Sequence, residues 1–265
     1  MIILLLLLVG VASGLTAGLL GVGGGLIFLP LAQFYYIDHL GYPTDFLKIL
    51  IGTSSAIIVS NSLSATILHH RKRNIDTSLL PWFAIACILG SGLGVLLTDN
   101  LPVDVVRCIL STFLIISAIR IYRGRQDKAE DEPLTGPRRM QIGAIGAGIS
   151  TLSSMLGLGG GALMIPVLNV MYLQPIKRAI GTASLFTFTV SASACFYYLL
   201  EPVATAYTAD HVVIGHVDLQ IAGLVALGGI AGTWIGTRML HRWRVALIQK
   251  IFAILLVVAA IKMLW

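Results

Sequence analysis

The sequence predicts an all-α integral membrane protein with two inverted-topology repeats, each a glycine-broken helical hairpin followed by three transmembrane helices. Three observations support this prediction. Of the 265 residues, 57% are hydrophobic and 11% are charged, whereas a soluble domain carries about 25% charged residues. Apolar runs of about 20 residues, the length that crosses a bilayer, recur along the chain. Three sequence blocks also occur twice, in the same order.

The duplicated blocks define the repeat and its boundaries. "GLLGVGGGLIFLP" (18–30) returns as "SMLGLGGGALMIP" (154–166), "KILIGTSSAII" (48–58) as "KRAIGTASLFT" (177–187), and "LGSGLG" (89–94) as "AGTWIG" (231–236). The chain therefore divides into membrane repeat 1 (residues 1–122), a polar linker (123–139) and membrane repeat 2 (140–265).

Each repeat begins with an apolar stretch that contains a triple glycine. These stretches, 1–37 and 142–172, are too long for one span and short for two. We therefore expect one helix in, a break at the glycines, and a shorter helix back out. The spans expected after the two hairpins are 49–68, 79–97, 105–119, 179–200, 219–237 and 245–261.

The positive charge predicts the orientation of the chain. Of the 18 basic residues, three lie at 71–73, six between 120 and 139, two at 177–178 and three between 238 and 244. All of these fall on one side of the expected topology, and basic loops are cytoplasmic. The linker is then cytoplasmic, both termini are extracytoplasmic, and the two repeats have opposite orientations. Because this accounts for the net charge of +6, we expect the lipid bilayer and no nucleic acid as a partner.

The glycine break predicts an anion site in the middle of the membrane. Inverted repeats with broken helices are typical of secondary transporters, whose substrate lies near the midplane. A helix that begins there presents free N–H groups and a partial positive charge. Close helix packing is the alternative role for glycine, and it fits Gly90, Gly94, Gly232 and Gly236 well. The residues expected to bind the anion through their backbone are Gly23, Gly24, Gly25, Gly159, Gly160 and Gly161.

Small polar side chains in the repeated "GTSS" and "GTAS" form a second candidate group. Thr53, Ser55, Thr182 and Ser184 are expected to donate to the anion, and Asn61 is expected to add specificity. Such hydroxyls also often bond only to their own i−4 carbonyl.

Other polar residues have structural interpretations. Asp76 and Asp218 occupy matched positions before a span and are expected to be helix N-caps.

No pattern in the sequence predicts an enzyme. HExxH, GxSxG and paired acidic residues within a span are missing, and no GK[ST] follows the glycines as it does in a P-loop. The three cysteines, Cys87, Cys108 and Cys195, lie in apolar runs without a CxxC pair. We therefore expect no metal site, no cofactor and no ATP hydrolysis.

The duplicated glycine blocks, the "IGTSS" and "IGTAS" that follow them, the basic linker and the length resemble the TauE/SafE family of membrane anion permeases, the sulfite exporter family. This resemblance implies a multi-pass inner (plasma) membrane protein that moves sulfite, an organosulfonate or another small sulfur-containing anion, with export as the expected direction. A passive anion channel and a membrane subunit of a sulfur-metabolism complex are the alternatives. The sequence does not predict the coupling ion or whether the chain forms a homo-oligomer.

Overall fold

The computed structural model describes residues 2–43, 46–98, 136–202 and 212–264, together with residues 111, 112, 115, 116, 118, 119 and 122. The predicted span at 105–119 and the linker at 123–139 therefore lie largely outside the described residues.

Helices make up nearly all of the described chain. Five of them are long and apolar enough to cross a membrane, namely α1, α3, α4, α8 and α9, so the chain is a multi-pass membrane protein. The helices are α1 (Ile2–Leu20), α2 (Gly25–Gln33), α3 (Phe46–Arg71), α4 (Leu80–Leu97), α6 (Gly136–Leu156), α7 (Gly161–Pro166), α8 (Ile176–Leu200), α9 (Leu219–Arg242) and α10 (Val245–Leu264). The short elements are the π-helices η1 (Phe34–His39) and η3 (Val167–Met171), the 3-10 helix η2 (Thr77–Leu79), and strands β1 (Val213–Ile214) and β2 (Val217–Asp218), which form an antiparallel hairpin.

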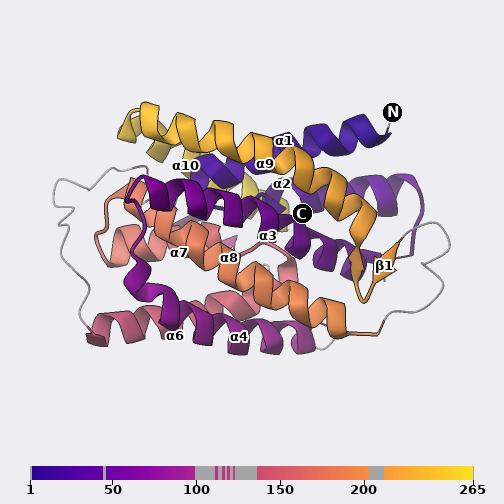
Figure 1. Cartoon of the computed structure of the whole chain (residues 1–265), viewed down its shortest axis with the longest axis horizontal. Coiled ribbons are helices and arrows are strands. Elements are labelled where there is room, and N and C mark those ends of the chain that lie inside the picture. Colours follow the sequence, from indigo (N-terminus) through magenta and orange to yellow (C-terminus); the bar gives the residue numbers. More distant parts are fainter. Residues whose placement is uncertain are drawn as a thin grey trace.

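The long helices lie along the long axis of the molecule in three pairs (Figure 1). Helix α1 packs along α9, α4 packs along α6, and α3 crosses α8 between them. Glycine lets the outer pairs approach closely, because a Cβ on Gly232 would meet Val11 O of α1 and a Cβ on Gly90 would meet Ala147 O of α6. The close-packing role predicted for these glycines is confirmed.

The pairs differ in direction. Successive glycines of α1 face successively later residues of α9, from Val225 to Thr237, so these two helices run parallel. By contrast, Lys48 near the start of α3 forms an ion pair of 3.1 Å with Glu201 just after the end of α8, so α3 and α8 are antiparallel.

The predicted breaks at the triple glycines are confirmed. Helix α1 ends at Leu20 and α2 begins at Gly25, while α6 ends at Leu156 and α7 begins at Gly161. The prolines of the two blocks do not end these short helices. Pro30 lies inside α2, and α7 passes through Pro166 into the π-helix η3.

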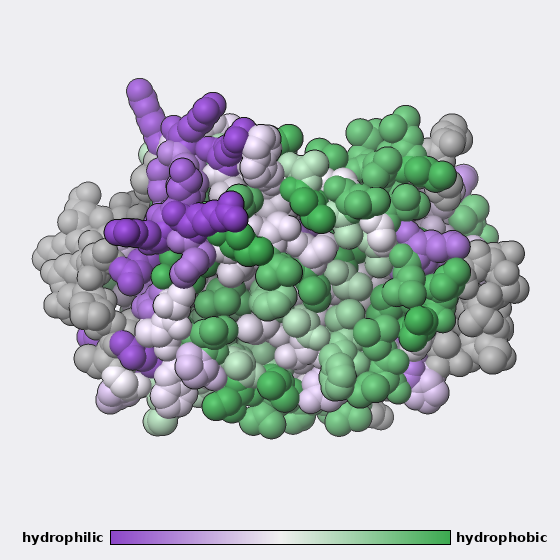
Figure 2. All heavy atoms as spheres, in the orientation of Figure 1, coloured by the Kyte–Doolittle hydropathy of each residue, from purple (hydrophilic) through white to green (hydrophobic). Residues whose placement is uncertain are grey.

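Polar side chains gather at one end of the molecule, while the middle of the visible face is apolar (Figure 2). The basic loops predicted to share a side do meet there. Arg178, in the first turn of α8, lies 3.8 Å from Asp76, before α4. Asn74 of the same loop lies 3.4 Å from Nδ1 of His241 near the end of α9. We call this the basic end.

Candidate functional site

Two buried glycine-rich loops interrupt the helices in the interior of the molecule. Residues 21–24 connect α1 to α2, and residues 157–160 connect α6 to α7. Gly21, Gly23 and Gly24 have φ angles of 68°, 82° and 90°, and Gly157, Gly159 and Gly160 have φ angles of 61°, 75° and 78°. This left-handed backbone is open to glycine and strained for other residues. The loops therefore have nearly the same conformation, and each ends in a left-handed glycine that caps the next helix.

The two loops are in direct contact. A Cβ on Gly25 would lie 2.5 Å from Gly157 O, and a Cβ on Gly161 would meet Gly21 O. Ile58 of α3 and Thr187 of α8 close the space beside them. Their methyl groups lie against both Gly23 and Gly159, at 2.5–3.0 Å from where a Cβ would stand. The loops are packed shut in this conformation.

One hydroxyl group ties each loop to a helix of the opposite half of the chain. Ser54 Oγ of α3 donates to Gly157 O at 2.9 Å, and Thr187 Oγ1 of α8 donates to Gly21 O at 3.1 Å. All four groups are buried. These bonds satisfy carbonyl groups that a helix would otherwise pair internally.

The N–H groups of the three consecutive glycines in each loop make no hydrogen bond within the described part of the chain. Gly24 O accepts from Ile27 N and Phe28 N at 3.1 Å each, and Gly160 O accepts from the corresponding amides of α7 at 3.1 and 3.0 Å. The short helices thus start in the ordinary way and leave their first donors unpaired. Within the described residues, no hydrogen bond is made by the N–H groups of Gly23, Gly24, Gly25, Gly159, Gly160 and Gly161.

Each loop also has a buried polar side chain with an unsatisfied atom beside it. Asn61 Nδ2 of α3 donates to Ser13 Oγ at 3.3 Å and to Gly23 O at 3.4 Å, while its Oδ1 has no partner. Ser153 Oγ of α6 is unpartnered and lies 3.2 Å from where a Cβ on Gly160 would stand. Asn61 and Ser153 are 0% and 1% exposed, so water does not satisfy these atoms from the surface.

The repeated threonines lie elsewhere and hold the turns before two spans. Thr53 Oγ1 accepts from Asp218 N at 2.9 Å, and Thr182 Oγ1 accepts from Asp76 N at 3.0 Å. Glycine precedes each threonine because the same turn comes close there: a Cβ on Gly52 would meet His216 O. The "GT" dipeptides therefore dock a turn onto a helix, and the structure does not place Thr53 or Thr182 at the glycine loops.

The aspartates of these turns cap helices as predicted. Asp218 Oδ1 accepts from Gln220 N and Ile221 N at 2.9 and 3.0 Å, and Asp76 Oδ1 accepts from Ser78 N at 3.1 Å. Both cap predictions are confirmed.

The remaining predicted hydroxyls bond within their own helices. Ser55 Oγ donates to Ile51 O at 3.1 Å and Ser184 Oγ donates to Ile180 O at 3.0 Å, the i−4 pattern that was the alternative interpretation. Ser184 is still close to a loop, because its Oγ lies 3.1 Å from where a Cβ on Gly21 would stand.

Sequence reasoning missed Ser54 and Ser153 and did not single out Thr187. It favoured hydroxyls that occur at the same position in both repeats, but Ser54 corresponds to Ala183 and Thr187 corresponds to Ile58. One sequence signal could have pointed to Ser54 and Thr187: both halves of the chain carry further hydroxyl residues within a few positions of the repeated "GT".

Comparisons with known proteins agree over the full length of the chain. The profile of the family described as "Sulfite exporter TauE/SafE" matches residues 6–263. A "Probable membrane transporter protein" of Haemophilus influenzae is 28% identical, covering 98% of this chain and 97% of the relative. Proteins with that description from Methanocaldococcus jannaschii (28% identical, covering 89% and 85%) and Bacillus subtilis (25% identical, covering 89% and 86%) are also similar. No solved structure matches the chain.

Proposed function

Because the chain belongs to the sulfite exporter TauE/SafE family, a family of membrane transporters and not of enzymes, we propose that it is a secondary transporter of small sulfur-containing anions. Sulfite or an organosulfonate is the substrate class, and export across the inner membrane is the direction. The anion binds between the two glycine loops, at the backbone N–H groups of Gly23–Gly25 and Gly159–Gly161.

The free N–H groups carry this proposal. An unpaired buried N–H costs about 1–3 kcal/mol, so we infer that a ligand compensates the six unpaired N–H groups of the two loops and helix starts. Donors from two helix starts suit the oxygens of a tetrahedral or pyramidal oxyanion, and they need no lysine or arginine.

The arrangement of the helices supports two inverted repeats around this site. Helices in corresponding positions, α3 and α8, are antiparallel, and each half packs its first helix against the other half (α1 on α9, α6 on α4). The basic end is then cytoplasmic, and both chain termini are extracytoplasmic.

Access to the site requires movement. Ile58 and Thr187 fill the space beside the loops, so an anion enters only when α3 and α8 shift. Rocking of one repeat against the other would open the site to alternate sides. This favours a carrier over an open pore.

The test is flux in proteoliposomes that contain only this protein, loaded with labelled sulfite and competed with thiosulfate, sulfate, a short sulfonate and a carboxylate. The site variant is Gly161→Ala, whose Cβ would meet Gly21 O and Thr187 Oγ1. The matched control is Gly148→Ala in α6, where nothing lies within 4 Å. We expect saturable sulfite flux that sulfur oxyanions compete, retained in the control and lost in the site variant.

Two outcomes would contradict the proposal. Normal flux in a Gly161→Ala variant would show that the anion does not bind at the glycine loops during transport. Flux that shows no saturation and no stimulation by substrate on the opposite side would indicate a passive channel. Folding of each variant is checked by its elution as a single species from size-exclusion chromatography.

A further inference from the structure

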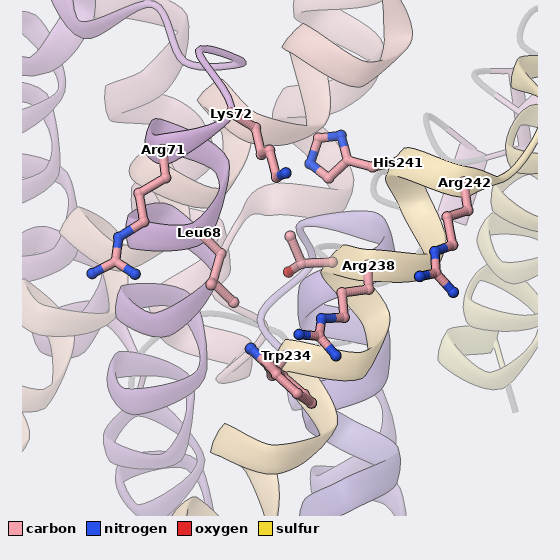
Figure 3. Close-up of a pocket in the computed structure, with 8 residues that line it drawn as sticks. Leu68, Arg71, Lys72, Trp234, Arg238, His241 and Arg242 are labelled. Carbon is pink, nitrogen blue, oxygen red and sulfur yellow. The ribbon is translucent and has the colours of Figure 1, made fainter.

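A groove of about 590 Å³ lies at the basic end, between the C-terminal ends of α3 and α9. Two apolar side chains, Leu68 and Trp234, lie about one helical turn before Arg71 and Arg238 on α3 and α9 (Figure 3). Cationic side chains surround the rest of the groove. The residues that line the groove are Leu68, Arg71, Lys72, Trp234, Thr237, Arg238, His241 and Arg242.

The charge in the groove is all of one sign. Lys72 and Arg238 point into it, and Arg71 and Arg242 flank it on α3 and α9 (Figure 3). None of the residues that line the groove is acidic, and no ion pair joins these four cations to another described residue. Nε2 of His241 is buried without a partner. The groove therefore holds donors and positive charge that no group of the described chain neutralises.

The apolar part of the groove continues into an exposed apolar surface of α3 and α9. Trp234 is 47% exposed and continues a row of exposed apolar side chains on α9, including Leu227 and Ile230, while Leu63 and Ile67 are exposed on α3. The guanidinium of Arg238 stacks over the Trp234 ring at 3.3 Å from its centroid. Cations above and an apolar wall below follow the order of headgroup and acyl chain in a phospholipid.

The corresponding place in the other half is filled. By the offsets of the repeated blocks, Trp234 corresponds to Gly92 of α4 and Leu68 corresponds to Tyr197 of α8. The Tyr197 ring packs onto Gly92, with its hydroxyl oxygen 3.0 Å from where a Cβ would stand. The open groove is therefore not a necessary product of the duplicated architecture.

We propose that this groove binds an anionic phospholipid, with the phosphate among Arg71, Lys72, Arg238 and Arg242 and one acyl chain along Trp234 and Leu68. Arginine and lysine pair with phosphate oxygens, and basic pockets between membrane helices on the cytoplasmic side bind anionic headgroups. A small free anion would use the cations but not the apolar wall. The site is separate from the glycine loops and does not depend on which anion is transported.

The experiment measures lipid retention by native mass spectrometry. Full-length protein in detergent is titrated with equimolar phosphatidylglycerol and phosphatidylcholine, and separately with phosphatidylglycerol plus excess inorganic phosphate. The groove variant is Lys72→Gln/Arg238→Gln. The control is Arg138→Gln/Arg139→Gln, which removes two charges from the start of α6, at the basic end but outside the groove.

We expect one bound phosphatidylglycerol in preference to phosphatidylcholine, with an affinity that falls about tenfold in the groove variant and less than about twofold in the control. Equal retention of both lipids, or equal affinity in the groove variant, would overturn the proposal. Inorganic phosphate is also titrated alone. If it displaces phosphatidylglycerol at the concentrations at which it binds the lipid-free protein, the proposal would be overturned, because the ligand would then be a free anion.

A second measurement keeps every charge in place. Phosphatidylglycerol with brominated acyl chains quenches tryptophan fluorescence on contact. We expect the quenched fraction to fall in Trp234→Phe compared with the wild type, whereas it does not fall in Trp243→Phe. Identical quenching in the wild type and Trp234→Phe would show that no acyl chain lies along this wall.

Discussion

Replacing Thr187 by valine tests whether the glycine loops must be held in place for transport. Valine keeps the shape of the side chain but removes the donor to Gly21 O, a bond of 3.1 Å between buried groups. A buried acceptor left without a donor costs about 1–3 kcal/mol. The penalty falls on the conformation in which the loop is ordered. A loss of about 1.4 kcal/mol lowers the ratio of ordered to disordered loop about tenfold, and because the anion binds only the ordered loop, the apparent KM rises by up to the same factor.

The assay is initial flux of labelled sulfite into proteoliposomes as a function of concentration. We expect KM to rise about tenfold in Thr187→Val and to return near the wild-type value in Thr187→Ser, which restores the hydroxyl. Thr151→Val is the control, because Thr151 Oγ1 bonds only Ala147 O of its own helix at 3.0 Å. An unchanged KM in Thr187→Val, with the protein folded, would refute the idea that this bond positions the site.

Three further predictions concern stability and the division between site and scaffold. Thr53→Val removes the acceptor of Asp218 N and should lower the free energy of unfolding by about 1–2 kcal/mol. We expect the thermal midpoint of unfolding to fall while the KM for sulfite stays constant. A changed KM would instead place Thr53 at the substrate. Gly232→Ile drives a side chain into the backbone of α1 and should abolish monodisperse protein in size-exclusion chromatography, whereas Gly223→Ile on the same helix, with nothing within 4 Å, should leave it intact. Ser54→Ala should raise KM as Thr187→Val does, because it removes the donor to Gly157 O on the other loop. A raised KM in only one of these two variants would indicate that the two loops do not contribute equally to binding.

The helical breaks, most of the spans and the helix caps were predictable because their causes are local. Three adjacent glycines do not favour a helix, and in the structure one helix ends three residues before them and the next begins at the third glycine. An aspartate before an apolar run caps it, as Asp218 does. The glycines of the α1–α9 and α4–α6 contacts were also recognisable, because small residues four apart are typical of close membrane helix packing.

The composition of the candidate site was harder to predict because it depends on contacts between distant segments. Ser54 reaches Gly157 across 103 residues and Thr187 reaches Gly21 across 166, and neither residue is repeated at the equivalent position. The duplicated sequence blocks therefore directed attention to Thr53 and Thr182, which hold turns. The basic residues of the groove were predicted only as part of the positive charge on the cytoplasmic side. That Lys72 and Arg238, which come from two different helix ends, line the same groove depends on the packed structure.

The contact between the two glycine loops has a consequence for substrate choice. The proposed anion-binding groups are peptide N–H groups, and these are chemically the same in every protein with such loops. They recognise charge and size but cannot tell one oxyanion from another. Discrimination then falls to the few side chains that touch the loops, chiefly Ile58, Asn61 and Thr187. A transporter built this way can acquire a new cargo through one or two substitutions in α3 or α8 while its charge-binding backbone stays the same.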